Sequence, residues 1–566
     1  MPSRRRPSAQ ALAAALIWPG CMALCATCAT CATCAATAAA AQDPPLPVRI
    51  AIDAAAHRHP ISPLIYGLSF ATTQTLSDLR VPINRSGGNS ASAYNWRLDA
   101  RNAGKDWYFE SLPVNPDDIN DQFGERFVAL THAAGAVPML TIPMLGRVAR
   151  LGPDRKPLAS FSIAKYGPQQ DRDVHGLADA GNGIAQDGTP IAGNDPNDAS
   201  VPHDPQSETA RIAELVRKFG AAGAGNERYY LMDNEPSLWQ LIHRDIHPVG
   251  AHASEVADDV VAYSRAVKAA DPKAQIVAPE EWGWQGYRYS GFDQQYAIAH
   301  GLDHTPDRER ETHGMDYVPW LLAQWKQAGR PIDVFSLHFY PQGGEYSETG
   351  AAETPAVELS RNRSTRDLWD PNYKDPTWID SVVELIPRMR KWVDTYYYPG
   401  TPIALTEYNW GADATMNGAT AQADLLGIFG REGLDIATRW GTPAPSAPVY
   451  KAFKLYRNYD GKGSAFGATS IADAVPDPDR VASFAALRDR DGAMTVMVIN
   501  KQLDRAADVM LALDHFADHG RIETWQLARN DISQLPDATY SEGRLHATLP
   551  PQSVTLFVLR GAAMGG

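Results

Sequence analysis

Residues 228–236 read Arg-Tyr-Tyr-Leu-Met-Asp-Asn-Glu-Pro, an apolar run that ends abruptly in polar residues and carries Glu235 near its end. Residues 402–410, Pro-Ile-Ala-Leu-Thr-Glu-Tyr-Asn-Trp, form a second apolar run that ends at Glu407. Short unbroken apolar runs are typical of strands buried on both faces, as in a parallel sheet. The two segments therefore predict two buried strands, each with a glutamate at its carboxyl end.

Eight runs of this kind alternate with segments of helical periodicity. The predicted strands are Leu64–Phe70, Val81–Ser86, Pro138–Pro143, Arg228–Asn234, Gln275–Pro279, Asp333–Tyr340, Pro402–Glu407 and Asp435–Trp440. The predicted helices include Thr209–Phe219, Ala253–Ala270, Val318–Gln327, Trp378–Tyr396 and Val449–Asn458. This alternation predicts an α/β fold with a TIM-like (β/α)8 catalytic barrel at residues 61–460. An open doubly wound sheet is the alternative, but no Gly-rich nucleotide loop follows a first strand.

After Asp460 the sequence changes to short alternating runs separated by Gly- and Pro-containing turns. The runs are Val481–Leu487, Met494–Asn500, Val509–Leu513, Ile522–Leu527, Leu545–Leu549 and Val554–Leu559. They predict an antiparallel β-sandwich at residues 461–566, packed on the barrel because no long Pro/Ser/Gly linker intervenes. Residues 42–60 contain a further strand, Val48–Asp53, which we expect to join this sheet because chain termini often lie close together.

Residues 1–41 have the three-part pattern of a signal peptide. A basic start at Arg4–Arg6 precedes an apolar run at residues 11–24 and a small-residue end at Ala39–Ala41. The apolar run is shorter than the ~20 residues that a membrane span needs. We therefore expect a secreted or periplasmic protein without a membrane anchor. The five cysteines, Cys21, Cys25, Cys28, Cys31 and Cys34, all lie in this segment, which excludes a disulfide framework or a Cys-ligated zinc elsewhere.

The charge balance excludes one class of partner. The chain has 52 Lys and Arg residues against 66 Asp and Glu residues, a formal net charge of −14, and no basic block after its first few residues. Nucleic-acid-binding proteins carry a basic patch or stripe instead. We therefore expect no nucleic-acid partner, and an uncharged ligand suits the composition better.

Two glutamates at barrel strand ends have a specific chemical use. Active-site residues of such barrels lie at the carboxyl ends of strands, so Glu235 and Glu407, which close the fourth and seventh predicted strands, would share one cleft. Facing carboxylates are the apparatus of glycoside hydrolysis. We predict Glu235 as acid/base and Glu407 as nucleophile. A separation of ~5–5.5 Å between the two carboxyl groups would mean retention of the anomeric configuration, and ~6.5–9.5 Å would mean inversion.

Other polar residues at strand ends are expected to support this pair. Asn234 could hydrogen-bond the sugar 2-hydroxyl, and Arg85, with Asn89 nearby, could hold a carboxylate ionised. His338 and Tyr340 could orient the nucleophile, although Arg85 and His338 could equally serve packing. Aromatic rings offer stacking faces to sugars but also fill cores. The candidate sugar platforms are Trp239, Trp282, Trp284, Trp369 and Trp410, of which we expect about half to contact substrate.

The segment 179–204 is rich in Gly, Asn, Asp and Pro and has no helical or strand period. A long loop inside a compact domain is usually functional or disordered. Asp195, Asn197 and Asp198 could supply oxygen ligands to a structural calcium ion, although a solvated cluster of turns explains the composition equally well. No cofactor is required for the chemistry proposed here, and metal binding stays open.

Several longer segments resemble glycoside hydrolase family 44 over nearly the whole chain after the signal. They are Arg85–Trp96 (RSGGNSASAYNW), Tyr229–His247 (YYLMDNEPSLWQLIHRDIH), Arg363–Trp378 (RSTRDLWDPNYKDPTW), Ile386–Met389 (IPRM) and Tyr398–Gly411 (YPGTPIALTEYNWG). The resemblance implies an endo-β-1,4-glucanase or xyloglucanase with a TIM-like barrel, a sandwich built from both chain ends and a retaining mechanism. It also implies that Glu235 matches the acid/base and Glu407 the nucleophile. Glu280 and Glu281, beside the fifth strand, depart from the family pattern.

The expected partner is a β-glucan polysaccharide, and we expect a monomer. A xylanase or mannanase of the same architecture is the first alternative, because pocket contacts cannot be read from sequence. A non-catalytic polysaccharide-binding protein is the second, and it would be favoured if either glutamate were absent. A metal-dependent hydrolase is disfavoured because the 15 histidines include no H-E-x-x-H motif.

Overall fold

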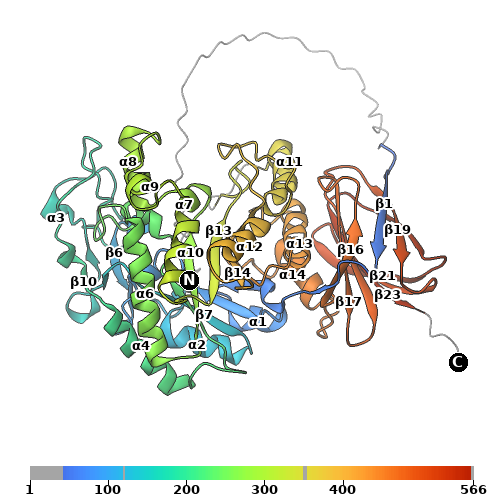
Figure 1. The fold of residues 1–566 in the computed structure, drawn as a ribbon, viewed down its shortest axis with the longest axis horizontal. Helices are drawn as coiled ribbons and strands as arrows, with labels where there is room; N and C mark the ends of the chain where they lie inside the picture. The colour runs from blue at the N-terminus through green and yellow to red at the C-terminus, as the bar shows by residue number, and fades with distance from the viewer. Residues whose placement is uncertain (1–42, 119–120, 348–352, 562–566) are drawn as a thin grey trace, which may run out of the picture.

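The computed structural model describes residues 43–118, 121–347 and 353–561. The predicted signal peptide lies outside the described residues. Figure 1 shows a helix-covered barrel beside a β-sandwich. The barrel strands, in chain order, are β3 (Gly67–Ser69), β4 (Ile83–Ser86), β7 (Val137–Ile142), β11 (Tyr229–Met232), β12 (Gln275–Glu281), β13 (Val334–Phe339), β14 (Ile403–Tyr408) and β15 (Ile436–Arg439). They close in the order β11-β12-β13-β14-β15-β3-β4-β7. The predicted barrel is confirmed, and each strand overlaps its predicted run.

Helices surround the barrel strands. They are α1 (Thr73–Asp78), α2 (Gly124–Ala133), α3 (Ile163–Tyr166), α4 (Pro205–Phe219), α5 (Trp239–Ile242), α6 (Ala253–Ala270), α7 (Trp284–Arg288), α8 (Gly291–His300), α9 (Pro306–Arg310), α10 (Tyr317–Gln327), α11 (Pro355–Ser364), α12 (Leu385–Tyr396), α13 (Met416–Arg431) and α14 (Pro448–Arg457). None within the described ranges is long and apolar enough to cross a membrane.

Helix α12 begins at Leu385, seven residues later than the predicted start at Trp378. Glu384, which precedes it, has a left-handed backbone with φ 45°. Pro387 then falls in the first turn, where its missing N–H needs no partner. Residues 378–384 are therefore free to form a loop instead of a helical turn, and this loop carries Trp378 to the surface.

The barrel interior is filled by a layer of apolar side chains, and nearly every strand contributes one. The layer comprises Ile83, Met139, Leu231, Val277, Val334, Ala404 and Ile436. A larger cluster packs the strands against the surrounding helices. Truncating a buried Leu such as Leu231 to Ala typically costs about 2–5 kcal/mol. This packed interior is a rigid base for the strand ends above it.

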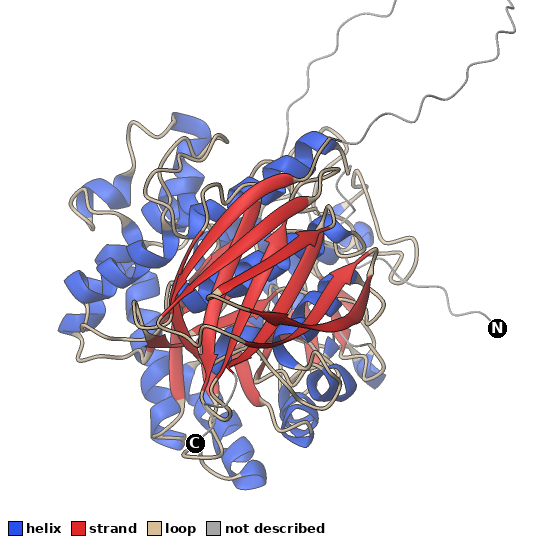
Figure 2. Cartoon of the chain, turned by 90° about the vertical axis from the view of Figure 1, so that its right-hand side faces the viewer, coloured by secondary structure: helices blue, strands red, loops and turns tan. Residues whose placement is uncertain are grey.

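The C-terminal residues form a single folded sheet. Its strands are β16 (Thr469–Ala474), β17 (Val481–Arg488), β18 (Ala493–Asn500), β19 (Ala507–Asp514), β20 (Gly520–Ala528), β21 (Asp531–Tyr540), β22 (Arg544–Leu549) and β23 (Ser553–Gly561), joined by β1 (Leu46–Asp53) and β2 (His59–Pro60). The order is β21-β20-β23-β18-β17-β16-β1-β19-β22, and β2 pairs with β16. Figure 2 shows this sheet face on, with helices behind it. Its halves enclose a second apolar cluster, which includes Ile50, Val496 and Leu511.

Two details of this sheet differ from the sequence prediction. The pairing of β1 with β19 is parallel, whereas the other pairs in the sheet are antiparallel. Strand β21 is mostly exposed and lies at the sheet edge, so it lacks the apolar alternation by which the other strands were predicted. Its pairing with β20 forms it instead.

Helix α13 lies between the barrel and the sandwich (Figure 1) and is buried from Asn417 to Gly430. A Cβ on Gly427 would lie 2.1 Å from the Phe484 ring of β17, so only glycine permits this approach. Asp424 of α13 accepts a hydrogen bond from Lys501 Nζ at 2.5 Å, and both side chains are buried. The two parts of the chain are therefore joined by close packing and by a buried ion pair.

The segment between β4 and α4 adds two small sheets beside the barrel. Strands β5 (Ala100–Asn102), β6 (Glu110–Pro113) and β9 (Leu158–Ala159) form one sheet, and β8 (Arg147–Ala149) pairs with β10 (Ser200–Pro202) in the other. These strands give the long polar insertion local order.

Candidate active site

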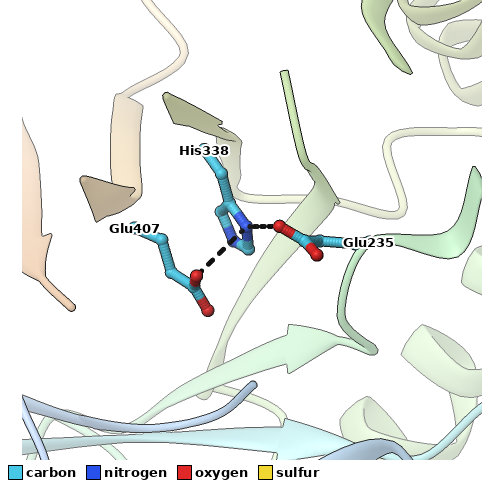
Figure 3. Close-up of side chains that lie close together, drawn as sticks. All are labelled: Glu235, His338 and Glu407. Atoms are coloured by element: carbon cyan, nitrogen blue, oxygen red, sulfur yellow. Dashed lines mark hydrogen bonds and ion pairs between the residues drawn. The ribbon is translucent and has the colours of Figure 1, made fainter. Parts of the chain in front are cut away.

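Glu235 and Glu407 lie together at the carboxyl end of the barrel. Glu235 follows the fourth barrel strand, β11, and its φ of 47° turns the chain sharply there. Glu407 lies in the seventh strand, β14. Their side chains keep 15% and 7% exposure. One carboxylate oxygen of each glutamate lies within 4.8 Å of the other and of a His338 nitrogen, and Figure 3 shows the two side chains reaching this ring from opposite sides.

Arg85 and Tyr340 hold both oxygens of Glu407. Arg85 Nη1 donates to Oε1 at 2.6 Å, and the Tyr340 hydroxyl donates to Oε2 at 2.9 Å. Arg85 comes from β4 and is fully buried. Charge-assisted hydrogen bonds of this kind favour an ionised carboxylate and fix its orientation. Both oxygens of Glu407 are thus held in a fixed orientation.

His338 lies between the two glutamates and is fully buried. Its Nδ1 is 2.9 Å from Glu235 Oε1 and its Nε2 is 3.2 Å from Glu280 Oε2. Burial alone would lower the pKa of His338, but the charge of Glu407 and the hydrogen bonds to Glu235 and Glu280 together raise this pKa to about 10. The ring is therefore an imidazolium that donates from both nitrogens.

Glu235 is held in its protonated form more readily than an ordinary glutamate. Burial raises the pKa of its carboxyl, although the hydrogen bond and charge of His338 act in the opposite direction. Glu407, by contrast, receives N–H and O–H donors from Arg85 and Tyr340. Two carboxyl groups in unlike surroundings are suited to unlike roles in proton transfer.

Asn234 and Asn89 are drawn into the same network. Asn234 Oδ1 accepts from Arg85 Nη2 at 3.1 Å, and its Nδ2 donates to Asn89 Oδ1 at 3.0 Å. Asn89 Nδ2 in turn donates to Asp106 at 2.7 Å. The structure therefore brings together every polar residue that the sequence predicted to surround the two glutamates.

Glu280 is the functional residue that the sequence prediction failed to place. It is the penultimate residue of the fifth barrel strand, β12, and is buried against Arg85, His338 and Thr406. Its position at a strand end was visible in the sequence, but its partners come from three other strands. Glu281 binds the Ser237 backbone N–H and hydroxyl instead, at 3.2 and 2.6 Å.

The predicted tryptophan platforms separate by burial into two that lie in the core and three that stay partly exposed. Trp239 and Trp410 are 1% and 2% exposed and pack in the core, where Trp410 Nε1 also donates to Ser364, so burial excludes sugar stacking on them as they lie here. Trp369 lies under the guanidinium of Arg431, 4.2 Å from the ring centre. Trp282 and Trp284 remain partly exposed beyond β12.

Two other tryptophans, neither predicted as a sugar platform, are connected to residues around the glutamates. Trp440 follows the eighth strand, and its ring lies 5.8 Å from the Arg85 guanidinium carbon. Trp378 is 53% exposed, and its Nε1 donates to Gln342 Oε1 at 3.1 Å. Gln342 Nε2 donates to the Tyr340 carbonyl at 2.9 Å, which ties this indole to a residue that holds Glu407. The end of the predicted eighth strand could have indicated Trp440.

The three predicted calcium ligands each bind a group of the protein itself. Asp198 binds Lys165 Nζ with both oxygens, at 2.6 and 2.7 Å, and Asn197 Oδ1 accepts from Arg147 at 2.6 Å. Asp195 caps its own turn by accepting from the Asn197 N–H. Cationic side chains thus bind Asn197 and Asp198, and calcium binding by these three residues stays a prediction.

Glu235, His338 and Glu407 also have the spacing of a metal-binding group. An imidazolium has no free lone pair, however, and the pKa of about 10 keeps His338 in that form. The charge of Arg85 beside Glu407 further opposes a cation here. The cluster suits proton transfer better than metal ligation.

Comparisons with known proteins agree with this geometry. The sequence model of glycoside hydrolase family 44 matches residues 100–343. Endoglucanase A of Paenibacillus lautus is 30% identical over 548 residues, covering 91% of this chain and 72% of that protein. CelM2, a bifunctional glucanase-xylanase from a metagenome library, has a crystal structure with TM-score 0.88 and 51% identity, covering 92% of this chain and 100% of that one.

A family 44 xyloglucanase from Paenibacillus polymyxa has TM-score 0.74 and 28% identity, covering 91% of this chain and 99% of that one. These likenesses extend over both the barrel and the sandwich. Together with the two strand-end glutamates they lead to one conclusion: the chain belongs to glycoside hydrolase family 44 and is an endo-acting glycoside hydrolase.

Proposed function

We propose that this protein hydrolyses internal β-1,4-glucosidic bonds of glucans, xyloglucan among them, with retention of the anomeric configuration. Glu407 is the nucleophile and Glu235 is the acid/base. The observation that carries the proposal is the approach of the two carboxylates, an oxygen of each lying within 4.8 Å of the other. Retaining enzymes have carboxyl groups ~5–5.5 Å apart, whereas inverting enzymes need ~6.5–9.5 Å to admit a water molecule.

In the first step Glu407 attacks the anomeric carbon while Glu235 gives its proton to the departing glycosidic oxygen. A covalent glycosyl-enzyme forms, and the bond to the leaving sugar breaks. In the second step Glu235, now ionised, takes a proton from water, which attacks the anomeric carbon and releases Glu407. His338 donates to Glu235 through Nδ1, so its positive charge stabilises the ionised form of Glu235 between the two steps.

Trp378 is a sugar platform of this proposed site. Its indole is exposed and is held by Gln342, which also donates to the Tyr340 carbonyl, rather than packed into the core. The C–H face of a glucose ring stacks on such a surface. Gln342 connects this indole to the backbone of Tyr340, the residue whose hydroxyl binds Glu407, so a ring stacked there would belong to the same substrate strand.

Xylan is a second candidate substrate. The observation that favours it is the 51% identity to CelM2, a bifunctional glucanase-xylanase. Xyloglucan is favoured by the likeness to the Paenibacillus polymyxa xyloglucanase, and the endoglucanase relative favours plain β-1,4-glucan. Relative rates of reducing-sugar release from xyloglucan, carboxymethyl cellulose, xylan and glucomannan, measured in parallel, separate these candidates.

We also propose export by the signal at residues 1–41 and a monomeric enzyme. The residue pattern supports the first. N-terminal sequencing of the exported protein and light scattering of the purified enzyme test the two statements.

The Glu407→Gly variant tests the catalytic proposal. Turnover should be lost, and azide should restore it by entering the vacated space and yielding a glycosyl azide of inverted configuration. Hydrolysis by this variant at the rate of the unmodified enzyme would count against the mechanism. So would a product of the unmodified enzyme whose anomeric configuration is inverted relative to the substrate.

A further inference from the structure

Glu280 is a third carboxylate beside the proposed catalytic pair, and the two-glutamate mechanism gives it no role. It is fully buried. Its Oε2 accepts from Arg85 Nη2 at 3.3 Å and from His338 Nε2 at 3.2 Å, and its Oε1 accepts from the Thr406 hydroxyl at 2.8 Å. Each of these partners either binds a catalytic glutamate or adjoins one in sequence.

The backbone aims Glu280 at these partners. The pairing of β12 with β13 shifts register between Pro279 and Glu281, and Glu280 has φ 61°. This irregularity lets two successive glutamates serve different neighbours, because Glu281 contacts Ser237 instead. The Glu280 carbonyl also accepts the Glu235 backbone N–H at 3.0 Å, so the two residues are linked through main chain as well.

Glu280 compensates the buried positive charge of His338 and of its neighbour Arg85. The charged groups that face the His338 ring are Glu235, Glu280, Glu407 and Arg85. The Tyr287 hydroxyl donates to the backbone carbonyl oxygen of His338. His338 and Arg85 are two fully buried cations, and each donates to Glu280. Buried cations in contact require compensating anions, and Glu280 accepts a hydrogen bond from both, whereas Glu407 accepts one from Arg85 and lies 3.7 Å from His338.

We propose that Glu280 is a positioning residue for the acid: it accepts Nε2–H of His338 so that the charged ring presents Nδ1–H to Glu235, and it anchors Arg85 so that Nη1 is left for Glu407. The hydrogen bond that His338 donates to Glu280 also helps raise the pKa of His338. Glu280 thereby controls the proton affinity of Glu235 through His338 without touching the substrate.

The direction in which the pKa of Glu235 shifts in a Glu280 variant distinguishes action through His338 from a direct effect of the Glu280 charge on Glu235. Glu280→Gln keeps the side-chain shape and removes the charge. If the charge of Glu280 acted directly on Glu235, removing this nearby anion would lower the pKa of Glu235. Acting through His338, loss of the Glu280 acceptor lowers the pKa of the ring and no longer fixes its orientation. The Nδ1–H donor then stabilises ionised Glu235 less, so the pKa of Glu235 rises. The basic limb of kcat/KM against pH reports this acid in the free enzyme.

The experiment compares the pH profile of kcat/KM on xyloglucan for the full chain and for Glu280→Gln. We expect the basic limb to move upward by about 0.5–1 pH unit. We also expect kcat/KM at the optimum to fall about 10- to 100-fold, because the acid is misplaced. A limb that moves downward or stays in place overturns the proposal.

Glu281→Gln is the matched control. Glu281 is equally buried and adjacent, but burial raises its pKa to about 8, so the amide replaces a group that is already uncharged at neutral pH. It should leave the basic limb in place. In a His338→Gln background, Glu280→Gln should give no further upward shift, and an undiminished shift there contradicts action through His338.

Glu280→Asp is the second variant, and its pH profile is measured if Glu280→Gln does not fold. It keeps the charge but withdraws the carboxylate by one methylene, so the upward shift should be smaller. An unmoved limb in this variant also contradicts the proposal. The inference rests on Glu235 being the acid, which leaving-group dependence of Glu235→Ala tests separately, so the two failures are distinguishable.

Discussion

Arg85 Nη1 lies 2.6 Å from Oε1 of Glu407, although 322 residues separate the two in the chain. The same guanidinium contacts Asn234 and Glu280, so one buried cation joins the second, fourth, fifth and seventh barrel strands. It stabilises the fold and orients the proposed nucleophile at once. The first prediction separates these two effects.

Replacing Arg85 by Ala should lower the free energy of unfolding by about 3–5 kcal/mol, because two buried carboxylates lose their cation. Activity should fall even where the variant is fully folded, because Glu407 loses its guanidinium donor. Chemical denaturation and kcat measure the two effects. Arg217→Ala, which breaks an exposed pair with Glu214, is the control and should cost less than about 1 kcal/mol. Equal costs for the two variants would be the contrary outcome.

Removing the proposed acid should make activity depend on the leaving group. Glu235→Ala should lose most of its activity on polysaccharide, where the departing oxygen needs a proton, and about 10²–10⁴-fold is the usual contribution of a general acid. It should lose far less on aryl glycosides with acidic phenols, which depart without protonation. Rates on a series of aryl glycosides give the measurement. The same loss on every member would contradict the assignment of Glu235.

Two tryptophans that the sequence does not distinguish should respond differently to substitution. Trp378→Ala removes an exposed indole, so KM on long glucans should rise about tenfold while Tm changes little. Trp410→Ala removes a core side chain and should destabilise the protein by about 3–5 kcal/mol. Kinetics and thermal unfolding of both variants test this pair. A large drop in Tm for Trp378→Ala would show that this ring serves packing instead.

Asp367 should make stability fall as pH rises. Burial, with the neighbouring Asp375, raises the pKa of Asp367 from its ordinary 3.8 to about 9. Between these two values the folded state binds one more proton than the unfolded state, so stability decreases across this window as pH rises. Asp367→Asn removes the coupling, and its stability advantage should grow by at most about 1.4 kcal/mol per pH unit.

Unfolding of Asp367→Asn and of the unmodified protein at pH 5 and pH 8 measures this difference. The exposed Asp154→Asn is the control and should show the same small effect at both values. If the difference in free energy of unfolding between Asp367→Asn and the unmodified protein did not vary with pH, protonation of the Asp367 carboxyl would not be linked to folding.

The buried pair of Lys501 and Asp424 should couple the sandwich to the barrel. Lys501→Met leaves the Asp424 charge buried without its cation and should cost about 3–5 kcal/mol. Combining it with Asp424→Leu should restore part of this loss, because no charge is then left unpaired. Unfolding of both single variants and the double variant gives the coupling. Additive losses would show that the ion pair contributes nothing of its own.

Much of the architecture follows from local patterns in the sequence. The eight apolar runs predict the barrel strands because burial on both faces demands unbroken apolar residues, and that demand acts within a few neighbours. Glu235 and Glu407 stand out for the same reason, since each interrupts such a run. Helix α6 runs from Ala253 to Ala270, the predicted range, because its apolar periodicity is strong.

Elements without such a pattern could not be predicted locally. Strand β21 is largely exposed and is formed by its pairing with β20, so its residues carry no buried face. The start of α12 depends on the left-handed backbone at Glu384, which the apolar spacing of residues 378–396 does not record. In both cases a neighbouring segment or a single backbone angle decides the structure.

The sequence by itself determined the eight barrel strands, the order of the two parts of the chain and the two glutamates at strand ends. Only the tertiary structure decided which residues surround them. Glu280 meets Arg85 and His338 across 195 and 58 residues of chain, and a register shift in β12 aims it there. Burial likewise separates Trp410 from Trp378. Side-chain partners and exposure depend on closure of the barrel, which joins strands that are distant in sequence.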